Sequence, residues 1–218
     1  MKNIIIIGAG GFGREIYSYI QDDIHKGFLK NCTFKGFVDD DEINFKNLKI
    51  KEEKWLGTID EYKYLENDFV IIAIGSIKAR NSIISKLNYK KVNFYSYIHN
   101  SVFVAADAIV NDGIIICPNS MIQSNALVEQ YCILNIFTSI GHDSVLGKGS
   151  ILSPYCTLNG NVHTGNNLFM GTHSSILLKS NIGSNCSIAA HTVVNGNIVD
   201  SMLVKDMKTQ KQVKNRLI

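Results

Sequence analysis

A six-residue repeat fills the second half of this 218-residue chain and limits its fold more than any other feature. From Ile98 to Val194 every sixth position is aliphatic, and Thr164 is the one exception. An α-helix has 3.6 residues per turn, so a strict period of six argues against helices and indicates short strands joined by turns. A single strand and turn cannot bury a face, and the repeats must therefore wind into coils that stack on one another.

A second set of positions, four residues after most of the aliphatic ones, holds small residues such as Ser120, Cys132 and Ser144. Each precedes the next aliphatic residue by two, so strand alternation places both on the same inward face. Turn-forming residues lie between them, as in Asn159-Gly160-Asn161. Three repeats per coil would give coils of about 18 residues and about five coils in all.

Cysteine content and charge exclude several functional classes. The five cysteines form no CxxC pair, so neither a disulfide framework nor a zinc site is predicted. Cys132, Cys156 and Cys186 occupy the small inward position and are expected in the core. A net charge of +3 gives no argument for nucleic-acid binding. With no apolar run of membrane-spanning length, we expect a cytoplasmic protein without a membrane span.

The first ninety-five residues follow a different pattern. A strand over residues 2–8 leads into Gly8-Ala9-Gly10-Gly11-Phe12-Gly13, after which a helical pattern begins. Glycines at this strand-to-helix turn allow a phosphate to approach the helix N-terminus. A second strand over residues 34–38 ends in acidic residues that suit a ribose hydroxyl, although a solvated loop is the alternative. A third strand over residues 69–74 ends at a glycine. The candidate nucleotide contacts are Gly8, Gly10, Gly11, Asp39, Asp40 and Gly75.

The combination of the two halves resembles a known family. It is similar to the bacterial sugar acetyltransferases of the hexapeptide-repeat superfamily, which acetylate nucleotide-linked amino sugars and sialic acids in surface-glycan pathways. The resemblance spans roughly residues 2–195. It rests on the glycine loop, on Phe37-Val38-Asp39-Asp40, on Ala73-Ile74-Gly75 with Arg80, and on the stretch from Ile133 to Gly147.

This resemblance implies an architecture and a set of ligands. A small α/β, Rossmann-like domain with a parallel sheet would bind a nucleotide sugar over residues 1–95. An all-β left-handed parallel β-helix would follow over residues 96–200, and a basic tail over residues 201–218. Acetyl-CoA would be the acetyl donor, without a metal. The protein would form a homotrimer whose active sites lie between subunits.

The resemblance also suggests which side chains take part in the reaction. His142, followed by Asp143, matches the family's catalytic base. An imidazole with a pKa of about 6.5 can accept the proton of an attacking amine at neutral pH. Asp143 would then fix the tautomer and stabilise the imidazolium, the alternative being a turn aspartate in solvent. Asn135 matches a family asparagine beside the sugar and would orient the acceptor.

Other family positions differ in this chain. Ile151 occupies the position where many relatives carry a second histidine. Phe12 occupies the position where some relatives have a histidine in the glycine loop, and it is therefore a candidate sugar contact. His173 and His191 lie 18 residues apart and should stack in one column with Tyr155. That column lines the acetyl-CoA cleft or is an inert ladder of rings. The candidate acetyl-CoA contacts are Gly160, Gly171, Thr172, His173 and Ala190. The lysines between Lys205 and Lys214 either contact the 3′-phosphate of CoA or remain in solvent.

These observations predict direct N-acetylation of the amino group of a UDP- or dTDP-linked amino-deoxy sugar. O-Acetylation of a sialic acid or another sugar hydroxyl is an alternative with the same machinery, and a longer acyl donor would need only a roomier cleft. A non-catalytic nucleotide-sugar-binding protein is an alternative from another class. A dehydrogenase is a third, but the chain offers no second nucleotide-binding half and no conventional catalytic domain.

Overall fold

The structure is a computed structural model that describes residues 1–46 and 55–206. Its N-terminal half is a parallel four-stranded sheet in the order β2-β1-β3-β4, with helices on its two faces. The elements are β1 (Lys2–Ile7), α1 (Gly11–His25), β2 (Cys32–Val38), α2 (Glu42–Lys46), β3 (Asp68–Ile72), α3 (Ile77–Tyr89) and β4 (Asn93–Phe94).

The isoleucine run of β1 explains why this sheet is covered on both faces. Ile4 and Ile6 point into the core shared with α1, whereas Ile5 and Ile7 point into the core shared with α3. All four side chains are fully buried. An uninterrupted apolar strand of this kind is typical of a parallel sheet between two helical layers, because neither face can be left in water.

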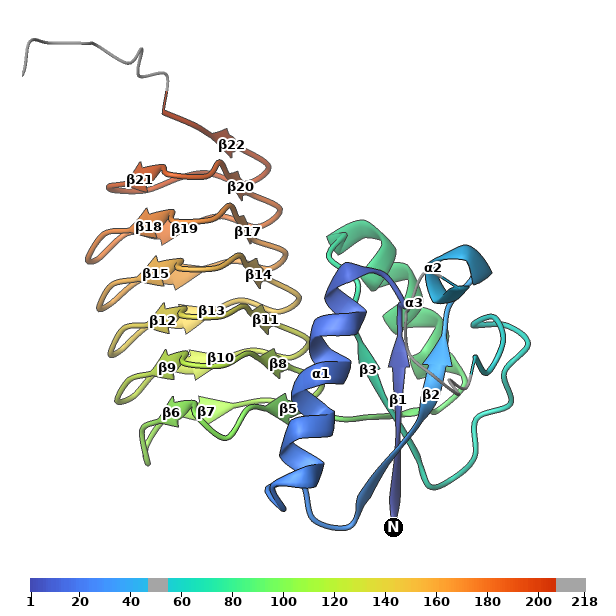
Figure 1. Cartoon of the computed structure of the whole chain (residues 1–218). Coiled ribbons are helices and arrows are strands. Elements are labelled where there is room, and N and C mark those ends of the chain that lie inside the picture. Colours follow the sequence, from blue (N-terminus) through green and yellow to red (C-terminus); the bar gives the residue numbers. More distant parts are fainter. Residues whose placement is uncertain (47–54, 207–218) are drawn as a thin grey trace, which may run out of the picture.

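The second half is a β-helix of two-residue strands that form three parallel sheets (Figure 1). Sheet B has the order β22-β20-β17-β14-β11-β8-β5, sheet C has β21-β18-β15-β12-β9-β6, and sheet D has β19-β16-β13-β10-β7. The strands are β5 (Tyr97–Ile98), β6 (Phe103–Val104), β7 (Ile109–Val110), β8 (Ile115–Ile116), β9 (Met121–Ile122), β10 (Leu127–Val128), β11 (Ile133–Leu134), β12 (Ser139–Ile140), β13 (Val145–Leu146), β14 (Ile151–Leu152), β15 (Thr157–Leu158), β16 (His163–Thr164), β17 (Phe169–Met170), β18 (Ser175–Ile176), β19 (Asn181–Ile182), β20 (Ser187–Ile188), β21 (Val193–Val194) and β22 (Leu203–Val204).

The aliphatic repeat forms the core of the β-helix, as predicted. Thr164, the non-aliphatic member, is also buried, and its hydroxyl accepts the Gly147 N–H at 2.9 Å. Ile98 departs from the expectation of an inward, buried residue, since it is 38% exposed. It belongs to the first coil, beneath which no further coil stacks. The small inward positions are buried as well, with the partly buried Ala108 as the exception.

The turns between successive strands of the β-helix share one backbone conformation. Non-glycine residues that recur every six positions, among them Asn119, Asn125 and Tyr131, have φ between 56° and 62°. This left-handed region is costly for most side chains and is best tolerated by Gly, Asn and Asp. The N–H of each such residue reaches the coil below, as in Asn161 N to His142 O at 2.9 Å. The frequent Asn and Gly residues therefore close the turns of the β-helix.

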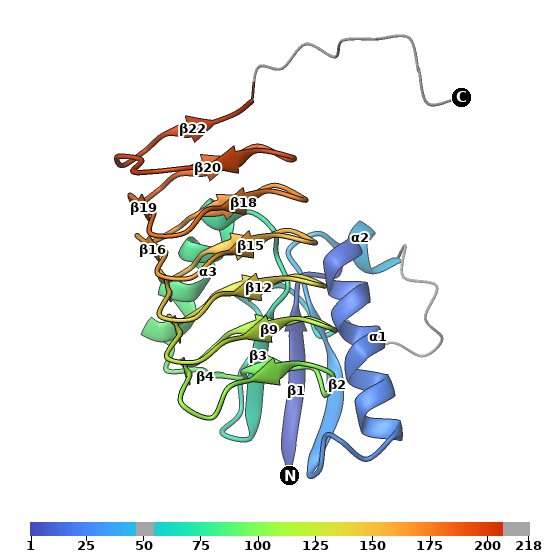
Figure 2. The same cartoon turned by 90° about the vertical axis from the view of Figure 1, so that its left-hand side faces the viewer.

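The N-terminal domain lies against the outer face of sheet B, beside β5, β8 and β11 (Figure 1). Ile115, Ile133 and Ile151 point outward from successive coils and share one core with Ile16 and Ile20 of α1. The later coils extend beyond this contact, and Figure 2 shows sheet C in front with the N-terminal domain behind it. The two parts are thus joined by a continuous apolar layer.

The described chain beyond residue 200 continues the β-helix, since β22 pairs with β20. The remainder of the expected basic tail, residues 207–218, lies outside the described residues. All five cysteines are free and buried, and Cys132, Cys156 and Cys186 lie in the β-helix core, as expected for their positions. No helix among the described residues is long and apolar enough to cross a bilayer.

Candidate active site

A cavity of about 210 Å³ lies between the glycine loop and the outer face of sheet B. It brings together several residues predicted from the sequence, which come from both halves of the chain. It is lined by Phe12, Glu15, Gly75, Ile133, Asn135, Ile151 and Ser153, and is called the junction cavity here.

The glycine loop leads from β1 into α1 beside this cavity. Gly8 has φ of 100°, and a Cβ there would lie 2.8 Å from Ile74 Cγ1. A Cβ on Gly13 would lie 2.0 Å from Gly8 O, so helix and strand approach each other too closely for any side chain. No atom lies within 4 Å of a Cβ built on Gly10, and only the far end of Arg14 lies at 4.0 Å from one built on Gly11. Gly8 and Gly13 are therefore required by packing, whereas Gly10 and Gly11 leave the helix N-terminus open to a ligand.

The two aspartates after β2 accept hydrogen bonds from backbone N–H groups of neighbouring segments. Asp39 Oδ2 accepts the Ala9 N–H at 2.6 Å, and its Oδ1 accepts the Asp41 N–H at 2.8 Å. Asp40 Oδ1 accepts the Ile59 N–H at 2.9 Å. Asp39 thus holds the glycine loop in place, and a contact from either carboxylate to a nucleotide stays a prediction.

Asn135 and Ile151 form the β-helix wall of the junction cavity. Asn135 follows β11, and its Oδ1 accepts the Ile136 N–H at 2.8 Å, so an acceptor on a ligand would meet the Nδ2 amide. Ile151 is 6% exposed and packs in the layer shared with α1. The position where relatives carry a second histidine is therefore part of an apolar wall in this chain.

His142 and Asp143 lie in the turn between β12 and β13, with the imidazole exposed. His142 Nδ1 is 2.7 Å from Asp143 Oδ2, and Asn125 Nδ2 donates to Asp143 Oδ1 at 2.8 Å. The hydrogen bond from Asn125, followed by that from His142, lowers the pKa of Asp143 below its ordinary value. The ring lies over Gly160, where a Cβ would be 2.4 Å from His142 Nε2. A glycine on the next coil thus makes room for the histidine.

Within one chain, the His142 turn and the junction cavity are on different sides of the β-helix. The cavity lies on the outer face of sheet B, under the N-terminal domain. His142 lies where sheet C meets sheet D, one full side of the coil away from Asn135. The structure therefore brings Phe12, Gly75 and Asn135 together but separates them from His142.

The rings predicted to stack do so, and Phe137 extends the column. Ring centroids are 5.0 Å apart for Phe137 and Tyr155, 4.6 Å for Tyr155 and His173, and 5.2 Å for His173 and His191. The rings are nearly parallel, and all four residues occupy the left-handed turn position between sheets B and C. This arrangement is called the ring column. It is compatible both with a cleft wall and with an inert ladder.

Among the other predicted acetyl-CoA contacts, Gly171, Thr172 and Ala190 surround the upper part of this column, whereas Gly160 lies under His142 between sheets C and D. Thr172 precedes His173 in the same turn, and Gly171 is buried, with a Cβ there reaching Ala190 N at 2.5 Å. Ala190 precedes His191 and is exposed. In residues 1–46 and 55–206, no group of three His, Cys, Asp or Glu side chains is placed to hold a metal ion.

Three further residues line the junction cavity without having been predicted as contacts from the sequence: Glu15, Ile133 and Ser153. The sequence does contain an indication of the apolar wall, because the outward residues Ile115, Ile133 and Ile151 are spaced one coil apart. Apolar residues that recur on an outward face indicate that something covers that face. Glu15 and Ser153 carry no comparable sequence signal.

Known proteins resemble both parts of the chain. Residues 3–87 match the PglD N-terminal domain family. UDP-N-acetylbacillosamine N-acetyltransferase of Bacillus subtilis is 29% identical over 120 residues, which are 53% of this chain and 51% of that protein. The alignment therefore spans about half the length of this curated relative.

Solved structures resemble nearly the whole chain. The acetyltransferase domain of PglB from Neisseria gonorrhoeae has 21% identity and a TM-score of 0.77, with 93% of this chain and 96% of that chain covered. WeeI from Acinetobacter baumannii has 20% identity and a TM-score of 0.81 with the same coverage. PerB from Caulobacter crescentus, solved with CoA and GDP-perosamine, has 22% identity and a TM-score of 0.75, and 93% of each chain is covered.

These similarities agree with the order of the two parts along the chain and with the left-handed β-helix expected for the second. The resemblance predicted from the sequence is confirmed to this extent: residues 3–87 match the PglD N-terminal domain family, and the chain has the fold of the PglB acetyltransferase domain and of PerB.

Proposed function

We propose that the protein transfers an acetyl group from acetyl-CoA to the amino group of a nucleotide-linked amino-deoxy sugar. The observation that carries the proposal is the His142–Asp143 pair, joined at 2.7 Å on an exposed turn over Gly160. If Nδ1–H donates to Asp143, then Nε2 is the free ring nitrogen and can accept a proton. An amine attacks a thioester only as the free base, so this nitrogen supplies what the reaction needs.

The transfer itself is direct. The amine nitrogen attacks the thioester carbon, Nε2 of His142 takes the ammonium proton, and the thiolate of CoA leaves with the electrons of the broken C–S bond. An acyl-enzyme through cysteine has no support, because all five thiols are buried. Burial also raises the pKa of Cys117 and Cys132 to about 12, which leaves them protonated at neutral pH.

The junction cavity is the proposed acceptor site. Gly10 and Gly11 leave the N-terminus of α1 open to a diphosphate, and Asn135 offers an amide to the sugar. Two relatives support a nucleotide-linked sugar, since one is named for UDP-N-acetylbacillosamine and another was solved with GDP-perosamine. We propose a UDP- or dTDP-linked sugar of surface-glycan synthesis for this chain.

A homotrimer would reconcile the separated parts of the site. In a single chain, one side of the coil lies between Asn135 and His142. Placing the His142 turn of one subunit beside the junction cavity and ring column of its neighbour would complete the site. Acetyl-CoA would then lie along His173, where the small, exposed Ala190 leaves room for its pantetheine arm.

The proposal is tested by incubating the protein with acetyl-CoA and a panel of UDP-, dTDP- and GDP-linked amino sugars, and separately with sialic acids. Release of CoA thiol is measured, and mass spectrometry locates the acetyl group. Turnover on an amino sugar supports N-acetylation. Turnover confined to hydroxyl acceptors would replace it with O-acetylation, and binding of the nucleotide sugars without turnover would favour a non-catalytic role.

A further inference from the structure

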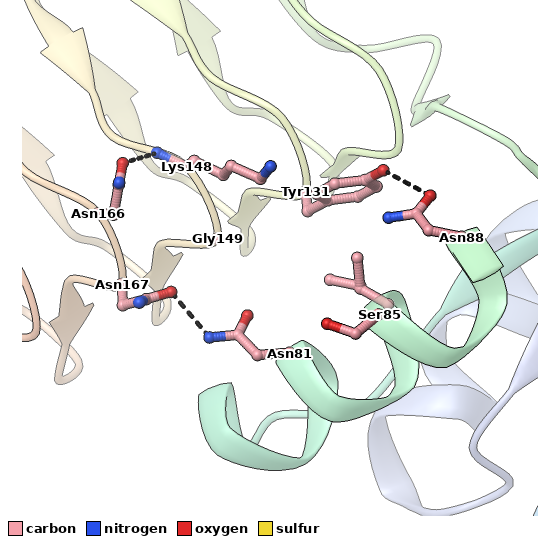
Figure 3. Close-up of a pocket in the computed structure, with 9 residues that line it drawn as sticks. Asn81, Ser85, Asn88, Tyr131, Lys148, Gly149, Asn166 and Asn167 are labelled. Carbon is pink, nitrogen blue, oxygen red and sulfur yellow. Dashed lines mark hydrogen bonds between the residues drawn. The ribbon is translucent and has the colours of Figure 1, made fainter.

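A second cavity, of about 240 Å³, opens between α3 and the turns of the β-helix (Figure 3). It shares no lining residue with the junction cavity. The turns that follow β10, β13 and β16 form one wall and α3 forms the other. Asn81 of α3 donates to Asn167 Oδ1 at 3.0 Å and bridges the two walls. The cavity is called the α3 cavity here.

Hydrogen-bond donors predominate in the α3 cavity. Asn166 Oδ1 already accepts the Lys148 N–H at 3.1 Å, and Asn88 Oδ1 accepts the Tyr131 hydroxyl at 3.4 Å. Within the described part of the chain, the Nδ2 groups of Asn88 and Asn166 make no hydrogen bond. The amide oxygens of Asn88 and Asn166 are therefore engaged, whereas their N–H groups remain for a ligand.

The charge in and behind the α3 cavity is positive. No aspartate or glutamate lines it, and among the described residues no carboxylate lies within ion-pair distance of Lys148. The Lys148 ammonium lies 5.3 Å from the Tyr131 ring centroid. Arg80, 1% exposed, donates from Nη2 to Tyr131 O at 2.7 Å, while its Nε and Nη1 have no protein partner. Burial lowers the pKa of Arg80 to about 10, so the guanidinium stays charged behind the wall at neutral pH.

We propose that the α3 cavity binds the oxyanion group of a small ligand, a phosphate or a carboxylate, held by Lys148 and by the free amides of Asn88 and Asn166. A neutral sugar would leave the Lys148 ammonium without a counter-charge, whereas an oxyanion would pair with it directly. The anion would bridge α3 and the β-helix and would offset the unpaired cations on both sides. This site is separate from the proposed acceptor site, so its test does not depend on catalytic activity.

The test is a titration of ¹⁵N-labelled protein with inorganic phosphate, acetate or glucose at constant ionic strength, followed through the side-chain amide signals of Asn88 and Asn166. Saturable shifts of these signals with either anion, but not with glucose, are expected, and comparison of the two anions identifies the preferred group. These signals separate the cavity from phosphate bound at the glycine loop. Absence of saturation with both anions, or equal binding of glucose, would overturn the proposal.

Two variants test the mode of binding. Lys148→Met should weaken binding by about 10- to 100-fold, the effect of losing one charge-assisted hydrogen bond. Asn88→Asp keeps the shape but places a carboxylate in the cavity, and should abolish binding. Lys179→Met and Asn195→Asp, at exposed positions elsewhere, are the matched controls and should bind as the unmodified protein does. Unchanged affinity in both cavity variants, with melting temperatures preserved, would refute the assignment.

Discussion

Gly160→Ala gives a sharp test of His142 as the base. The backbone at Gly160 does not have positive φ, so alanine can adopt it. Its Cβ would lie 2.4 Å from His142 Nε2 and 2.6 Å from Cε1. Ordinary contacts between such atoms are about 3.5 Å, so the imidazole must move by roughly 1 Å. A displacement of that size at a reacting group costs about 100-fold in rate.

The assay is a steady-state measurement of CoA release at varied acetyl-CoA and saturating acceptor. If Gly160→Ala acts by displacing the base, kcat falls by about 100-fold while the KM for acetyl-CoA changes little. If Gly160 only makes room for acetyl-CoA, KM rises instead. Thr157→Ala, on the strand of the same coil, is the control and should retain activity and melting temperature.

A double-mutant cycle makes the argument refutable. Once His142 is alanine, no imidazole remains to be displaced, so Gly160→Ala should cause no further loss of kcat. An equal, additive loss in the His142→Ala background would show that Gly160 acts by another route. In that case Gly160 would not act by making room for the His142 ring.

Three further outcomes are expected. His142→Ala should lower kcat by about 10² to 10⁴ with the nucleotide sugar still bound, and an unchanged rate would remove it from the mechanism. Asn125→Ala removes the main cause of the lowered pKa of Asp143, so the pKa of this carboxyl group should rise when it is followed by NMR. A fall in this pKa would contradict the assigned hydrogen bond. A thiol reagent at pH 8 should label no cysteine in the native protein and all five after unfolding. Each thiol is buried, and burial raises the pKa values of Cys117 and Cys132 to about 12. Rapid labelling of the native protein would contradict this burial.

Much of the β-helix could be predicted because its contacts repeat locally. Each coil rests on its neighbours about 18 residues away, so the inward pattern alone specifies the core. The exception at Ile98 is an end effect, since repeat periodicity does not say which coil is the first of the stack. The Asn and Gly residues of the turns were also interpretable, because the left-handed conformation selects them.

The candidate site could be predicted only in part. His142 with Asp143 is a local pair, and its geometry follows from adjacent positions in one turn. The closeness of Phe12 to Asn135 depends on how one domain docks on the other, which no local pattern encodes. For the same reason the role of Asp39 in holding the glycine loop through Ala9 was not foreseen.

The sequence by itself determined the two architectures, since periodicity and glycine placement reflect short-range backbone requirements. Tertiary structure alone decided that the outer face of sheet B is covered by α1, that Ile151 belongs to an apolar wall, and that His142 lies on another side of the coil. It also created the α3 cavity around Lys148. The physical reason is that docking depends on the shapes and charges of two finished surfaces, whose residues come from distant parts of the chain.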